Sequence, residues 1–217
     1  MATGHDTDSH VIDGLHLRFP GSWWQIPLID PGEARESARR LVVESIGRAD
    51  QHAQLRAEMR LRLETAITEA REANAVRFAI AIEIVPDIPI PAFLGIFETG
   101  TDLRSASSTD AAAVMNLFAS GFDKADSARE FDPENSGVVP FERFAVGRSH
   151  VARRVRYRVI PAEGEAPEVT NLIVEFWMTV PGQRKIVLLA FTSPAVALID
   201  PLLNLFGAIV ASAQWDA

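Results

Sequence analysis

The feature that most limits the fold of this chain is a series of three strand-like segments in its last third. Apolar and polar side chains alternate along residues 148–160 and 169–180, and residues 184–192 carry apolar side chains on both faces. Only residues 161–168 and a turn at Pro181-Gly182 connect them. Because parallel strands need a crossover of about a dozen residues, such short connections predict an antiparallel meander.

The first two segments also predict their own register. Placing Val155 opposite Val174 creates an apolar face, which also contains the pairs Val151 with Met178, Arg153 with Phe176, and Tyr157 with Leu172. The other face then contains the pairs Arg154 with Glu175, His150 with Thr179, Ala152 with Trp177, and Arg158 with Asn171. A slip of one residue would exchange the two faces and lose these pairs.

A long helical segment precedes this meander. Residues 31–74 have apolar residues at helical spacing, after a typical helix start at Asp30-Pro31-Gly32-Glu33, and predict one long helix or two in series. Acids and arginines four residues apart, such as Glu58 and Arg62, predict a salt-bridged face toward solvent.

These elements predict an α+β fold in one domain, with an antiparallel sheet of about six or seven strands covered by helices on both faces. Residues 1–14 are expected to be a disordered tail, and residues 15–217 the domain. The other expected elements are a hairpin of strands 15–19 and 24–28, strands 76–85 and 92–99, a helix from about 105–110 to Gly121, a mobile loop 123–137, and a final helix to Ala213.

Composition excludes several classes of function. The net charge of −8 repels nucleic-acid phosphates, and with no cysteine there is no disulfide or thiolate chemistry. Common nucleotide-binding, hydrolase and metalloprotease motifs are missing, so we expect no cofactor and no metal. The tail has no signal-peptide character, and Pro194 and Pro201 interrupt the apolar segment 186–210, which predicts a soluble cytoplasmic protein without a membrane span. Among the basic residues, lysine occurs only at positions 124 and 185, which indicates a bacterium of high G+C content.

Two groups of residues are candidates for a site. His150, Arg154 and Glu175 form a candidate polar site on one face of the predicted meander, although a buried ion pair is more often structural than catalytic. The second candidate is a proline-stiffened apolar loop that suits a groove on a protein partner, and its residues are Pro86, Asp87, Ile88, Pro89, Ile90, Pro91 and Phe93.

The two ends of the chain resemble the PsbP-like α/β/α sandwich family. The resemblance is carried by Phe19-Pro20-Gly21-Ser22-Trp23-Trp24 and by a strand, Lys185 to Phe191, that runs through Thr192-Ser193-Pro194 into a helix carrying Phe206, Ile209 and Ser212. It covers roughly residues 15–28 and 141–213. The family includes photosystem accessory subunits, a Ran-binding import factor and actinobacterial lipoproteins, and the resemblance implies binding without catalytic residues.

Two functions follow as expectations. The first is a non-catalytic binding or accessory protein that acts through contacts with an unknown protein partner. The second is a small-molecule-binding protein or hydrolase-like enzyme with a cavity between sheet and helix, whose polar groups would be His150, Arg154 and Glu175.

Overall fold

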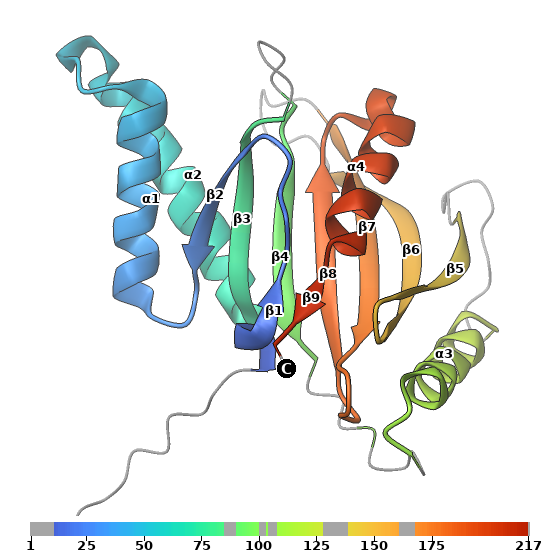
Figure 1. Cartoon of the computed structure of the whole chain (residues 1–217). Coiled ribbons are helices and arrows are strands. Elements are labelled where there is room, and N and C mark those ends of the chain that lie inside the picture. Colours follow the sequence, from blue (N-terminus) through green and yellow to red (C-terminus); the bar gives the residue numbers. More distant parts are fainter. Residues whose placement is uncertain are drawn as a thin grey trace, which may run out of the picture.

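The main element of the fold is a seven-stranded antiparallel sheet (Figure 1). The computed structural model describes residues 11–84, 90–99, 103, 108–127, 139–160 and 168–216. In order across the sheet the strands are β2 (Ser22–Pro27), β3 (Ala75–Glu83), β4 (Phe93–Glu98), β8 (Ile186–Ser193), β7 (Val169–Thr179), β6 (Ser149–Ile160) and β5 (Val139–Val146). All neighbouring strands are antiparallel. The structure therefore confirms the predicted α+β class and sheet size.

The register between β6 and β7 is the predicted one. Val155 lies opposite Val174, and Arg154 lies opposite Glu175. At the end of the ladder, the backbone N–H of His150 donates a hydrogen bond to Oγ1 of Thr179 at 2.9 Å. The alternation of side chains along these two strands was thus sufficient to fix their pairing.

One expectation about the strands is wrong, and one strand was not expected. β1 (Leu15–His16) does not form a hairpin with β2, because it pairs with β9 (Gln214–Trp215) near the other end of the chain, and β2 pairs with β3. The sheet also contains β5, which the sequence pattern did not predict. β5 is an edge strand with a proline at position 140, and proline lacks the N–H that a central strand would need.

The helices are α1 (Pro31–Ile46), α2 (Ala53–Glu72), α3 (Ala111–Ser127) and α4 (Ile199–Ala211), with short 3-10 helices η1 (Val11–Gly14), η2 (Asp50–His52) and η3 (Val196–Leu198). The predicted helical segment 31–74 is two helices, α1 and α2, which fold back on each other as a hairpin (Figure 1). Oδ1 of Asp30 caps α1 by accepting hydrogen bonds from the N–H groups of Gly32 and Glu33 at 2.6 and 2.9 Å. α1 ends at Ile46, and the next residue, Gly47, has a φ of 81°, which favours glycine.

α3 is longer than predicted. It runs through Gly121 to Ser127, so the first residues of the expected loop 123–137 are helical. Residues 128–137 lie outside the described chain.

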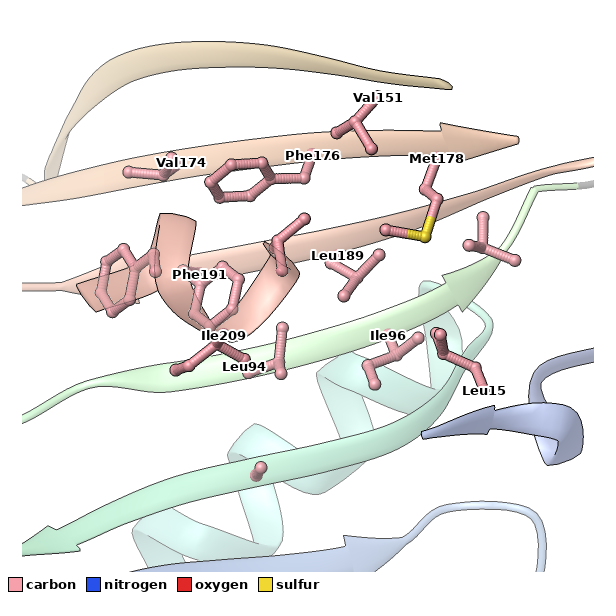
Figure 2. Close-up of a cluster of buried hydrophobic side chains, with 14 of the residues drawn as sticks. Leu15, Leu94, Ile96, Val151, Val174, Phe176, Met178, Leu189, Phe191 and Ile209 are labelled. Atoms are coloured by element: carbon pink, nitrogen blue, oxygen red, sulfur yellow. The ribbon is translucent and has the colours of Figure 1, made fainter. Parts of the chain in front are cut away.

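The larger hydrophobic core lies between the sheet and α4 (Figure 2). Phe206 of α4 stacks on Phe191 of β8 with 4.4 Å between ring centroids, and Phe176 of β7 meets Phe191 edge-on at 5.8 Å. Figure 2 shows Leu94, Leu189 and Ile209 in the same layer of side chains.

The other helices pack on the opposite face. Trp177 follows Phe176 in β7, and consecutive residues of a strand point to opposite faces, so the contact between Trp177 and Phe118 of α3 lies on the face away from α4. α1 and α2 pack on β2 and β3 through a second cluster of buried residues, which are Ile26, Leu28, Ala34, Ala38, Leu41, Val42, Leu63, Ile67 and Ala75.

Residues 11–14 belong to the fold and correct the expectation of a disordered tail over residues 1–14. Ile12 is fully buried, its N–H donates to Oε1 of Glu98 at 3.2 Å, and its carbonyl oxygen accepts from Nη2 of Arg77 at 2.7 Å. Residues 1–10 lie outside the described chain. Within the described ranges no helix has the length and hydropathy needed to cross a membrane.

Candidate functional site

A cavity of about 360 Å³ lies between the α1–α2 hairpin and strands β3 and β4. Its walls come from α1 (Leu41, Val42, Ser45), α2 (Met59, Arg62, Leu63, Ala66), β3 (Phe78, Ile80, Ala81, Ile82), Pro91 just before β4, and Phe93, the first residue of β4. All but two of these residues have apolar side chains, so the arrangement suits an apolar ligand.

The alternation of β3 explains the floor of the cavity. Its large side chains, which include Phe78 and Ile80, point toward the helical hairpin, while the small Ala79 packs in the core of the opposite face. The ring of Phe78 stacks on that of Phe93 in β4, with an interplanar angle of 9° and 6.2 Å between centroids. The floor is therefore a continuous aromatic and aliphatic surface.

The divergence of α2 from the sheet leaves this floor uncovered. In the second half of α2, Leu63 and Ile67 are buried, whereas Leu55 and Met59 in the first half are 51% and 42% exposed. In Figure 1 the η2 end of the hairpin lies farther from β3 than the end of α2 that leads into β3. Apolar side chains of both helices and of the sheet line the space that results.

The polar lining groups, Ser45 and Arg62, are both exposed. The predicted pairing of Arg62 with Glu58 does not form, and Oε1 of Glu58 instead accepts a hydrogen bond from Nε2 of Gln54 at 3.1 Å. With the residues that the structure describes, the side chain of Arg62 makes no ion pair or hydrogen bond. Its guanidinium is available at the rim.

The predicted polar site has a different arrangement from the one expected. Glu175 is buried, and its Oε1 accepts hydrogen bonds from Nε and Nη2 of Arg156 at 3.0 and 2.7 Å. The residue directly opposite, Arg154, is a neighbour in the ladder, but the ion pair is made on the diagonal. Long side chains reach diagonal neighbours in a sheet, so register alone did not identify the partner.

His150 does not join this pair. It lies four residues from Arg154 along β6, which is about 13 Å at roughly 3.3 Å per residue. The three predicted residues share one face of the sheet but do not converge on a common point. No group of three or more His, Asp or Glu side chains that suits a metal occurs in the described ranges.

The polar residues and the cavity share the face of the sheet that carries α3. Ile80, Phe93, Ile173 and Arg156 lie in one row across β3, β4, β7 and β6, with β8 contributing Thr192. Three strand spacings separate Phe93 from Arg156, which is about 14 Å. His150, Arg154 and Glu175 do not line the cavity beneath the α1–α2 hairpin.

Part of the predicted partner loop belongs to the cavity wall. Pro91 and Phe93 line the cavity, and Ile90 packs against the core on the α4 side of the sheet. Pro86, Asp87, Ile88 and Pro89 lie outside the described chain. The sequence signal for the remaining wall was the row of large side chains on β3, which by itself does not distinguish a cavity floor from a filled core.

Comparisons with models of known protein families, with curated proteins and with solved structures found no match to this chain.

Proposed function

We propose that this protein is a non-catalytic binding protein that holds a small apolar molecule between the α1–α2 hairpin and strands β3 and β4. The observation that carries the proposal is the cavity of about 360 Å³ with an almost entirely apolar lining. Sites for small molecules occupy roughly 300–1,000 Å³ and are lined mainly by apolar side chains with a few polar groups.

The composition of the lining favours binding over catalysis. Arg62 is the one charged side chain among the described lining residues, and a guanidinium donates hydrogen bonds but does not accept a proton from a substrate. Within the described part of the lining, the hydroxyl of Ser45 has no histidine or carboxylate beside it, as a serine nucleophile would need. The PsbP-like resemblance, which implies binding without catalysis, agrees with this proposal.

Contact with a protein partner remains the alternative proposal. It rests on the apolar loop 86–93, of which Pro91 and Phe93 form part of the cavity wall. Because Pro91 and Phe93 face the cavity, they are placed to contact a small ligand. The geometry therefore favours ligand binding in the cavity over contact with a protein partner.

We expect 1-decanol, a neutral molecule of suitable size, to bind the wild-type protein saturably in isothermal titration calorimetry. Ala66 lines the cavity from α2, so Ala66→Phe fills part of the space and should weaken the affinity at least about tenfold. Ala57→Phe adds the same ring to an exposed position on the same helix and should leave the affinity unchanged.

Far-UV circular dichroism shows whether each variant keeps its fold. Absence of binding to the wild-type protein would refute the proposed function. So would equal binding to both variants, because the site would then lie elsewhere.

A further inference from the structure

Among the residues that the structure describes, the cavity lining carries one positive charge and no negative charge. This charge belongs to Arg62, which is exposed on α2, and the hydroxyl-bearing Ser45 is exposed on α1. The buried lining residues of the same two helices are Leu41, Val42 and Leu63. The mouth therefore combines the polar Ser45 and Arg62 with the exposed apolar side chains of Met59 and Ile82, and buried apolar groups form the interior.

The guanidinium of Arg62 differs in its hydrogen bonding from that of Arg56, which lies six residues earlier on α2. Nη1 of Arg56 donates to the carbonyl oxygens of Gly47 and Ala49 at 2.9 and 2.7 Å and so fastens the turn between the helices. Arg62 makes no such bond within the described ranges, and Glu58 is engaged by another side chain of the helix. The N–H donors of Arg62 are available to a ligand.

We infer that the cavity takes a single-chain amphipathic monoanion such as a medium-chain carboxylate. The alkyl chain lies between the helices and the floor formed by Phe78, Ile80 and Phe93, and the carboxylate accepts hydrogen bonds from Arg62 at the mouth. This inference rests on the proposed function, because it assigns a ligand class to the same cavity.

Size and charge both limit the ligand to this class. A volume of about 360 Å³ lies near the lower end of the roughly 300–1,000 Å³ typical of small-molecule sites, which favours one chain of medium length over a larger ligand. A single arginine matches one negative charge, whereas a second charge on the ligand would meet an apolar wall without a partner. A polypeptide segment would bring backbone N–H and C=O groups into this lining, where their hydrogen bonds would be lost.

The expected contribution of Arg62 is moderate because its side chain is exposed to solvent. Ion pairs at exposed sites contribute up to about 1 kcal/mol, which corresponds to about a fivefold change in affinity. Salt screens such a pair, so carboxylate binding should also weaken as ionic strength rises, while binding of a neutral molecule should not.

The test compares decanoate with 1-decanol, by calorimetry at neutral pH and below the concentration at which decanoate forms micelles. The quantity of interest is the ratio of the two dissociation constants, because it cancels the contribution of the alkyl chain. Arg62→Gln should shift this ratio about fivefold against decanoate. The matched control is Arg60→Gln, an exposed arginine on α2 that does not line the cavity and should leave the ratio unchanged.

The outcomes separate the inference from the proposed function. A shift with Arg62→Gln that is absent in Arg60→Gln, and that disappears at high salt, supports the inference. Binding of both molecules with an equal ratio in all three proteins overturns it and leaves the proposed function standing. If decanol fails to bind, the proposed function is refuted, and the inference falls with it.

Discussion

The carboxylate of Glu175 is the most deeply buried charged group in the described sheet. Its side chain is 9% exposed, whereas that of its partner Arg156 is 43% exposed, and both hydrogen bonds from Arg156 go to the same oxygen. A buried carboxylate depends on its partner, because removing the partner leaves an uncompensated charge in a medium of low polarity.

Arg156→Ala should lower the free energy of unfolding by about 2 kcal/mol, between the typical costs of breaking exposed and buried ion pairs. Urea denaturation measures this change. Arg158→Ala removes the same charge from an exposed position two residues along β6 and should cost less than about 0.5 kcal/mol.

Combining Arg156→Ala with Glu175→Ala tests the pair itself. The double variant should be more stable than the sum of the single changes implies, since it leaves no unpaired carboxylate. Strict additivity would show that the ion pair contributes nothing. The sequence predicted that Glu175 forms an ion pair, but it gave Arg154 as the partner, whereas the partner is Arg156. Alternation shows which residues lie opposite each other, but it does not show which long side chain reaches a diagonal neighbour.

The start of α1 shows how a local pattern can fix an element. Asp30 accepts two hydrogen bonds from the first turn, as its position before Pro31 predicts. Asp30→Ala should lower the free energy of unfolding by about 1 kcal/mol, and Asp30→Asn, which keeps an acceptor oxygen, should cost only a few tenths. Thermal denaturation compares the two. An equal loss in both variants would mean that the negative charge matters and the cap geometry does not.

The end of α1 was harder to predict. Apolar spacing continues on both sides of Gly47, so it fits one long helix or two, and the sequence left this open. The choice is made by tertiary contacts, namely the hydrogen bonds of Arg56 to the turn and the packing of α1 against α2. Such contacts are absent from a local pattern.

The elements around the cavity were individually predictable, but the cavity was not. The strand 76–85 and the helical segment were expected at nearly their observed positions, with large side chains on one face of the strand. Whether helices cover that face tightly or diverge from it depends on the angle of the α1–α2 hairpin. No periodicity within one element encodes that angle, so Arg62 and Phe78 were not candidate site residues.

At the scale of the whole molecule, the segment 11–16 joins the two ends of the described chain, because it contacts both the sheet and the strand β9. Within this segment Leu15 is fully buried and pairs with Trp215, and its carbonyl oxygen accepts a hydrogen bond from Nη1 of Arg77. These partners are 62 and 200 residues away. The expected hairpin of 15–19 with 24–28 failed because the preference for a near neighbour was outweighed by burial against distant strands.

Leu15→Ala should lower the free energy of unfolding by about 3 kcal/mol, since it opens a cavity in the main core. Leu61→Ala makes the same change at a side chain that is 67% exposed and should cost less than about 0.5 kcal/mol. Chemical denaturation of the two variants gives the comparison. Equal small effects would show that the segment 11–16 can detach without cost to the core.

The order of strands in the sheet has a consequence for how the chain folds. β2, β3 and β4 follow one another in chain order, and β5, β6, β7 and β8 do the same, so β4–β8 is the one ladder of the described sheet that joins non-consecutive strands. Its pairs run from Glu98 with Val187 to Phe93 with Thr192. Forming it closes the longest loop in the sheet, and loop closure is the entropic barrier that slows folding. We therefore expect two half-sheets to assemble separately and the β4–β8 seam to close last.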